Sequence, residues 1–139
     1  MDQQLVDQKL ESLRRCITRV ETKLPESLEY FLQDLDAQDI IALNLTRAVQ
    51  MCVDIAAHWL AENTEVSAPK TMGQAFEALA QSGVITHELA HHMRLSVGFR
   101  NVMVHNYDDV NWEIVYSICS KHIVDFRTFA QVFSKLLAS

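Results

Sequence analysis

The sequence predicts an all-α fold, an antiparallel bundle of about five to six helices in one domain that spans residues 1–139. Apolar residues recur at spacings of three and four through most of the chain, which is the period of an amphipathic helix. No segment alternates between apolar and polar residues strongly enough to predict a strand. The breaks between the periodic segments are short, so consecutive helices are expected to lie antiparallel.

The N-terminal half of the chain predicts three helices. Apolar periodicity predicts an amphipathic helix over residues 2–22. Pro25 restarts the chain, because a proline fits the first turn of a helix, and the short helix that follows carries Phe31. Asp36 is a candidate cap for the next and longest helix, which runs to about Glu62 and is apolar over much of its circumference. We expect this helix to be the central pillar of the bundle.

The C-terminal half begins with a predicted loop over residues 63–70, which hold a proline and small polar residues. Thr71 and Gln74 have the spacing of a capping box, so they predict a short helix that ends at Gly83. Thr86 is expected to cap a further helix over residues 87–105.

A turn over residues 108–111 then leads into one final helix over residues 112–137. This final helix is expected to bury Ile114, Val115, Ile118, Ile123, Phe126, Phe129, Val132 and Leu136.

Composition limits the function classes. The net charge of −6 argues against a broad phosphate-binding surface, because nonspecific nucleic-acid affinity depends on basic contacts. An enzyme acting on RNA would have to confine its positive charge to a small cleft, with Arg94 and Arg100 as candidates. No secretory leader and no apolar stretch long enough to cross a bilayer is apparent, so a soluble, cytoplasmic protein is expected. Cys16, Cys52 and Cys119 are too far apart for a zinc or redox motif and are expected to be small buried apolar residues.

The segment from Phe99 to Tyr107 concentrates the residues that indicate chemistry. It contains Arg100, Asn101 and His105 as well as the tyrosine. Asn101 and His105 lie one turn apart on a helix and are therefore neighbours. Arg100 and His105 are about 140° apart around the helix axis and are expected to lie away from the core. One isolated helix therefore does not direct both groups at a single atom.

The same helix predicts a dimer. Val97 and Val104 lie one heptad apart on a face that is otherwise expected to be polar. We interpret this pair as the seam of a homodimer, with the site shared between two copies of the chain. The residues expected to face the core of the bundle are Leu95, Phe99, Val102 and Met103.

Arg100, Asn101, His105 and Tyr107 together resemble the R-x4-H-x-Y signature of HEPN-domain ribonucleases, specifically the HepT-like toxins of toxin–antitoxin pairs. Residues 98–101, the aspartates after Tyr107 and the closing residues 123–126 also look like that family, so the resemblance covers most of the chain. It implies a metal-independent endoribonuclease that needs no cofactor. Arg100 would hold the phosphate, His105 would transfer protons, and Asn101 would orient His105 or the phosphate.

The resemblance also implies how such a toxin is silenced. In the type VII-like HepT/MntA pairs, an MntA-like nucleotidyltransferase antitoxin attaches AMP to the tyrosine that matches Tyr107, using ATP and Mg²⁺ held by the antitoxin. Added phosphate would place negative charge beside Arg100 and occupy the groove meant for RNA.

Several alternatives stay open from the sequence. The chain could be a non-catalytic HEPN module that binds a nucleotide or a partner. His87, Glu88 and His91 form an H-E-x-x-H sequence, the zinc motif of metalloproteases, although a third ligand such as Glu113 has no supporting motif. Arg100 could instead pair with an acid while His105 stabilises a helix end, and the Tyr107 hydroxyl could bond Asp108 or Asp109.

Overall fold

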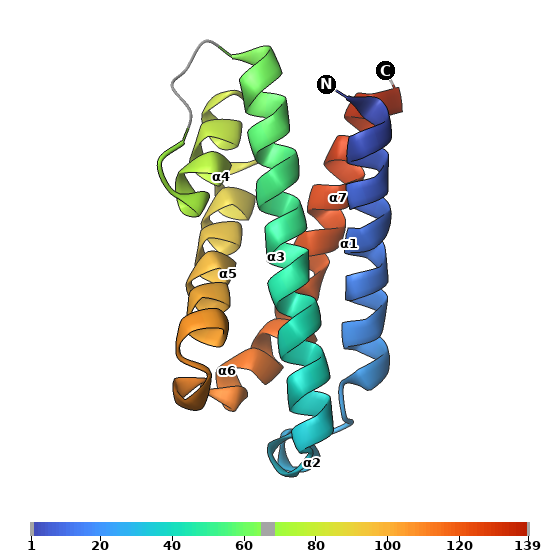
Figure 1. The fold of residues 1–139 in the computed structure, drawn as a ribbon, viewed down its shortest axis with the longest axis vertical. Helices are drawn as coiled ribbons and strands as arrows, with labels where there is room; N and C mark the ends of the chain where they lie inside the picture. The colour runs from blue at the N-terminus through green and yellow to red at the C-terminus, as the bar shows by residue number, and fades with distance from the viewer. Residues whose placement is uncertain (1, 65–68, 139) are drawn as a thin grey trace.

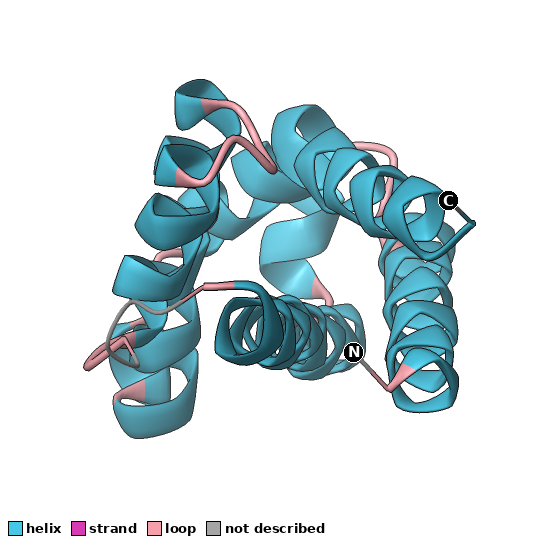
Figure 2. Cartoon of the chain, turned by 90° about the horizontal axis from the view of Figure 1, so that it is seen from above, coloured by secondary structure: helices cyan, strands magenta, loops and turns pink. Residues whose placement is uncertain are grey.

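The structure is a computed structural model that describes residues 2–64 and 69–138. Within these ranges it contains helices and no strand, as predicted (Figure 2). The helices are α1 (Gln3–Lys23), α2 (Leu28–Gln33), α3 (Leu35–Asn63), α4 (Met72–Gln81), α5 (His87–His105), α6 (Trp112–Ser117) and α7 (Ile123–Ala138). A π-helical segment, Ile118–His122, joins α6 to α7, so the described residues form six continuous helical rods.

The long helices α1, α3, α5 and α7 run up and down the molecule (Figure 1). The central helix is α3, which packs against α1, α4 and α5, and α7 packs against α1. Neighbouring long helices run antiparallel, so the C-terminal end of α5 lies beside α6, at the same end of the molecule as the start of α3 (Figure 1). The bundle and the central position of α3 confirm the prediction.

Capping residues set most of the helix boundaries. The Thr86 hydroxyl accepts a hydrogen bond from the Leu89 N–H at 3.0 Å, which fixes the start of α5 where it was predicted. The predicted Asp36 cap is wrong, because Asp34 accepts from the Ala37 N–H and α3 begins at Leu35. Asp36 lies in the first turn, where its negative charge still favours the positive end of the helix dipole.

Gly83 ends α4 in the left-handed conformation that favours glycine, with a φ of 79°. The N–H of its neighbour Val84 donates a hydrogen bond to the Leu79 carbonyl at 3.0 Å, which is the Schellman-type bond expected after a glycine at a helix C-terminus. The predicted loop over residues 63–70 is described only in part. Asn63 still belongs to α3, and residues 65–68 lie outside the described ranges.

The core of the bundle is built from one face of each long helix. By length and composition alone, α3 is apolar enough to cross a membrane, which differs from the sequence expectation. Half of that apolar window is buried inside the bundle, as in the central helix of a globular protein.

The three cysteines are free and buried, as expected. Burial raises the pKa of the Cys119 thiol to about 12.

The predicted final helix is interrupted by the π-helical segment. Buried residues at Val115, Cys119 and Ile123 are spaced by four, a spacing that drifts about 40° per step on an α-helix. A locally wider turn keeps these three side chains in the core. Ile114 and Leu136, expected to be buried, are exposed instead.

Candidate functional site

Arg100 turns inward from α5 toward α3, which differs from the predicted orientation away from the core. Its guanidinium donates to the Asn101 side-chain oxygen at 3.1 Å and lies 3.5 Å from the Gln50 side-chain oxygen on α3. Its Nε is buried and has no hydrogen-bond partner among the described residues. Both partners are neutral amides, so the expected alternative of an ion pair with a neighbouring acid is not what the described residues form.

Gln50 belongs to a polar chain that crosses the bundle. Its amide nitrogen donates to Asp54 at 2.9 Å, and the other Asp54 oxygen accepts from Lys9 on α1 at 3.0 Å. The Asp54 carboxylate thus contacts Lys9 and the Gln50 amide, and it reaches Arg100 only through Gln50. The guanidinium is held in position without being neutralised by direct contact.

His105 is the last residue of α5 and is exposed. Among the described residues, no hydrogen bond joins it to Arg100 or Asn101, and the Asn101 oxygen accepts from the arginine. A protonated histidine in the last turn is also favoured by the negative end of the helix dipole. The alternative that His105 only stabilises the end of α5 therefore stays open. The helix brings Arg100 and His105 to one end of the molecule without joining their side chains.

Tyr107 follows the helix rather than extending it. The α-helix ends at His105, and Tyr107 begins a 3-10 turn, so it does not return to the azimuth of Arg100 as a longer helix would allow. Its hydroxyl donates to the Asp39 carboxylate on α3, not to Asp108 or Asp109.

The surroundings of the Tyr107 phenol combine packing and a negative charge. Its ring packs at 5.6 Å from the ring of Trp112 on α6. Partial burial, then the hydrogen bond and the negative charge of Asp39, raise the pKa of Tyr107 well above its usual value. Tyr107 as a whole residue is 39% exposed, so its side chain is accessible at the surface while contacts with α3 and α6 fix its position.

The predicted dimer seam is wrong in one of its two residues. Val97 is only 8% exposed and belongs to the core, whereas Val104 is 45% exposed. The core face of α5 carries Met93, Val97 and Met103, and it is rotated away from the predicted face. Leu95 and Val102, expected in the core, are exposed at 56% and 37%.

The exposed residues Leu95 and Val102 belong to a different surface of α5. We call this surface the Leu95 stripe, and it consists of Leu95, Gly98, Val102 and His105. The spacings of three, four and three place all four on one side of α5. Apart from the two chain neighbours and the adjacent backbone of α5, no described atom lies within 4 Å of where a Cβ on Gly98 would be, so the middle of the stripe is open. An apolar stripe thus leads directly to the candidate acid/base residue.

Among the described residues, the H-E-x-x-H sequence is not part of a three-ligand cluster. His87, Glu88 and His91 are all exposed on the first turns of α5, and Glu113 is exposed on α6. Among the described residues, no group of three potential ligands within reach of one ion includes any of them. Arg94, the other predicted source of positive charge, pairs with Glu77 on α4.

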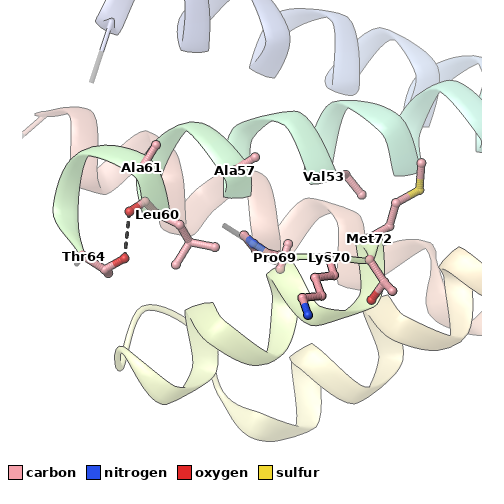
Figure 3. A pocket seen from close by; sticks show the side chains of 10 residues that line it. Val53, Ala57, Leu60, Ala61, Thr64, Pro69, Lys70 and Met72 are labelled. Carbon is pink, nitrogen blue, oxygen red and sulfur yellow. Dashed lines mark hydrogen bonds between the residues drawn. The ribbon is translucent and has the colours of Figure 1, made fainter. Parts of the chain in front are cut away.

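A pocket of about 540 Å³ lies between the end of α3 and the start of α4 (Figure 3). It is at the opposite end of the bundle from the C-terminal end of α5 (Figure 1). Its lining is mainly apolar, with Lys70 as the charged side chain. It offers no acid/base pair for catalysis.

Two residues that matter to this site, Asp39 and Gln50, were missed by sequence reasoning. Both lie on the central helix, eleven positions apart, which places them within about 20° of each other around the axis. Asp54 continues the same side. The sequence feature that could have identified Asp39 and Gln50 is a line of polar residues along one side of a helix, α3, that is otherwise largely apolar.

The family described as "Ribonuclease HepT-like" matches residues 13–133. The mRNA nuclease HepT of Shewanella oneidensis is 33% identical over 128 residues, which cover 92% of this chain and 95% of that protein. The tRNA nuclease HepT of Aphanizomenon flos-aquae is 26% identical and covers 96% of this chain and 90% of that protein.

Solved structures agree with the sequence matches. The tri-AMPylated Shewanella oneidensis HEPN toxin, in complex with its MNT antitoxin, superposes with a TM-score of 0.88 at 32% identity, covering 97% of this chain and 98% of that one. The Bacillus subtilis cytosolic protein YutE has a TM-score of 0.84 at 11% identity, covering 99% of this chain and 91% of that one, and therefore shows the fold alone. The chain belongs to the HepT-like ribonuclease family.

Proposed function

We propose that this chain is the toxin of a toxin–antitoxin pair and cuts cellular RNA in the cytoplasm without a metal ion, at a groove shared by two copies. The observation that carries this proposal is the state of Arg100. A permanently charged guanidinium near the end of α5 contacts two side-chain amides, and no carboxylate of the described residues forms an ion pair with it. Such a group is suited to donate two parallel hydrogen bonds to phosphate oxygens.

The proposed reaction is an attack within the RNA strand. The 2′-oxygen forms a bond to the adjacent phosphorus, and the bond from phosphorus to the 5′-oxygen breaks. His105 would accept the 2′ proton and, in protonated form, would donate one to the leaving oxygen, because an imidazole can exchange protons near neutral pH. Arg100 stabilises the charge that builds on the phosphate.

A second copy of the chain is proposed to complete the site. Within one chain, Arg100 turns inward to α3, while His105 lies exposed at the end of the Leu95 stripe. Pairing of two Leu95 stripes would cover Leu95 and Val102, let two helices approach closely at Gly98, and bring both His105 residues to one groove. The homodimer prediction is kept, with its seam moved from Val97 and Val104 to this stripe.

The seam is tested with two matched substitutions. Val102→Asp places a charge in the stripe and is expected to give monomers with little ribonuclease activity. Val104→Asp places the same charge on an exposed residue outside the stripe and should leave a dimer. Light scattering during gel filtration measures the mass of each variant. Monomeric wild-type protein, or equal effects of the two substitutions, would remove the shared groove from the proposal.

The sharing of residues is tested by mixing inactive chains. Arg100→Ala and His105→Ala are each expected to abolish RNA cleavage. If each site takes its arginine from one copy and its histidine from the other, a mixed dimer regains one intact site of two, and activity returns on mixing. No recovery after verified exchange of subunits would show that each site lies within one chain. If the AMP-free wild-type dimer leaves every RNA untouched, the non-catalytic alternative is favoured.

Tyr107 is proposed as the site of AMPylation by a nucleotidyltransferase antitoxin that brings ATP and Mg²⁺. The Tyr107 oxygen would attack the α-phosphorus of ATP, pyrophosphate would leave, and the phenolic proton would pass to the Asp39 carboxylate. The contact between this hydroxyl and Asp39 supports the assignment. The phenol is held neutral until attack, because the adjacent carboxylate disfavours the phenolate.

Intact-mass measurement of the chain co-expressed with the antitoxin tests this assignment. The mass is expected to rise by multiples of AMP on Tyr107, and Tyr107→Phe should prevent the rise. Asp39→Asn keeps an acceptor but removes the base, so modification should slow while RNA cleavage by unmodified protein persists. Unchanged modification in the Asp39 variant would exclude this residue as the proton acceptor.

A further inference from the structure

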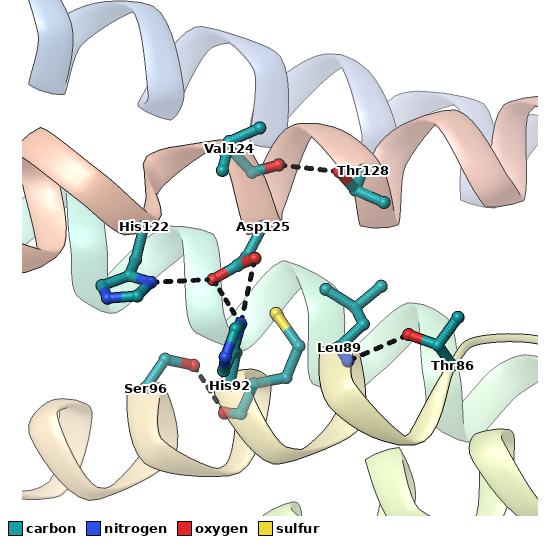
Figure 4. Close-up of polar contacts among 9 residues, drawn as sticks. Thr86, Leu89, His92, Ser96, His122, Val124, Asp125 and Thr128 are labelled. Carbon is teal, nitrogen blue, oxygen red and sulfur yellow. Dashed lines mark hydrogen bonds and ion pairs between the residues drawn. The ribbon is translucent and has the colours of Figure 1, made fainter.

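A second cluster of chemically active side chains lies away from Arg100 and Tyr107. His92 on α5 and His122 at the end of the π-helical segment both direct Nδ1 toward the carboxylate of Asp125 on α7 (Figure 4). His92 Nδ1 lies 3.3 and 3.2 Å from the two Asp125 oxygens. His122 Nδ1 lies 3.5 Å from one of them. The side chains of His92, His122 and Asp125 are 27%, 48% and 16% exposed.

The spacing of these atoms matches the edges of a metal coordination polyhedron. One potential ligand atom from each of the three residues lies within 4.8 Å of the other two. In a tetrahedral site with bonds of about 2.1 Å, neighbouring ligand atoms are about 3.4 Å apart. The measured separations between nitrogen and oxygen fall on both sides of that value, so an ion could be bound with small side-chain adjustments.

The surroundings provide space for an ion. A small pocket of about 50 Å³ is lined by the three residues together with Leu95, Ser96 and neighbouring apolar side chains. A single water molecule occupies about 30 Å³ in the liquid, so this pocket can hold an ion and one water.

The backbone brings His122 to the cluster in an unusual way. The Ile118–His122 segment is π-helical, and single π-turns are often found at functional sites. It places His122 on the same side as Asp125, three residues further along the chain. His92 comes from a different helix, so the cluster links α5 to the rod formed by α6 and α7.

We propose that His92, His122 and Asp125 bind one divalent transition-metal ion, such as Zn²⁺, with a fourth position open to solvent. Two imidazoles and one carboxylate favour transition metals over Mg²⁺ or Ca²⁺, which prefer oxygen ligands. The ion would clamp α5, the helix that carries Arg100 and His105, to the C-terminal helical rod. This proposal does not depend on the ribonuclease assignment.

Cobalt and zinc titrations of the full-length, metal-free protein test the proposal. Co²⁺ is expected to bind once per chain and to give the strong visible absorption of a site with fewer than six ligands. Zn²⁺ should displace it with the same stoichiometry. His122→Ala, a change at a half-exposed side chain, should abolish the absorption while the circular dichroism spectrum stays that of the wild type.

His91→Ala is the matched control. His91 lies next to His92 in the chain and is exposed, and with His87 it forms the other histidine pair on α5 able to chelate an ion. Its loss should leave the cobalt spectrum unchanged. Absence of the spectrum in wild-type protein overturns the proposal, as does a spectrum that survives His122→Ala or disappears with His91→Ala.

Thermal unfolding gives a second measurement. An ion that binds only the folded chain raises the melting temperature, and the rise grows with the logarithm of the ion concentration once that concentration exceeds the dissociation constant. Zn²⁺ should raise the melting temperature of the wild type and of His91→Ala, and should fail to raise that of His122→Ala. An equal rise in all three proteins would place the binding elsewhere.

Discussion

The orientation of α5 can be tested by substituting its two valines separately. Val97 is 8% exposed, and Val97→Ala removes two buried methyl groups. At about 0.8 kcal/mol for each buried carbon, with a cavity added, the expected loss in the free energy of unfolding is about 2 kcal/mol. Val104 is 45% exposed in the same helix, so Val104→Ala should change stability by less than about 0.5 kcal/mol.

Urea unfolding followed by circular dichroism measures this difference. Both substitutions replace valine by alanine in α5, so they share the gain in helix propensity, and the contrast between them reports burial. With a denaturant dependence of about 2 kcal/mol per molar, the midpoint for Val97→Ala should fall by about 1 M. The variants must be compared at one protein concentration, because dimer formation adds to apparent stability. Losses equal within about 0.5 kcal/mol, or a larger loss for Val104→Ala, would refute the orientation of α5.

Three further outcomes are expected. Gly83→Ala should lower the free energy of unfolding by about 1 kcal/mol in chemical denaturation, because an alanine is strained at a φ of 79°. In a spectrophotometric titration, Tyr107 should ionise at higher pH than an ordinary tyrosine, and Asp39→Asn should bring its pKa down. Because its folded pKa is raised, the contribution of Tyr107 to stability is complete below about pH 10 and is lost as pH rises further. Cys52, fully buried and with its pKa raised by burial, should react with a thiol reagent only on unfolding.

Local signals in the sequence were enough to place most of the helices. Thr71 and Thr86 cap α4 and α5 as predicted, and Gly83 ends α4, because each effect depends on a few adjacent residues. The Asp34 cap was missed because three acidic candidates, Asp34, Asp36 and Asp39, lie close together. Either of the first two fits a helix start by type alone.

The rotation of α5 could not be predicted in the same way, because its apolar residues lie on more than one side. Met93, Val97 and Met103 compete with Leu95 and Val102 for the core, and the periodicity of the helix does not choose between them. Packing against α3 and α4 decides the outcome. The orientation of Arg100 follows from that rotation, which is why it was wrong in the sequence prediction.

Contacts between distant segments were also beyond the sequence pattern. The hydrogen bond from Tyr107 to Asp39 spans 68 positions, and that between His92 and Asp125 spans 33. The position of His122 further depends on a π-helical segment whose extra width has no simple sequence signature. The motif residues were identified by their types and spacing, whereas their partners required the fold.

The central helix α3 explains why Arg100 and Tyr107 of the R-x4-H-x-Y motif are held in place by hydrogen bonds while His105 is not. It holds Arg100 through Gln50 and Tyr107 through Asp39, so both ends of the motif are fixed to one rigid element. His105 lies between them in sequence but points to no partner within the described chain. A proton-transferring group gains from being positioned by what it acts on or by a second copy. The residues proposed to bind the phosphate and to be AMPylated are therefore preorganised by each chain, and the residue proposed for acid/base chemistry is the one whose placement a second copy would complete.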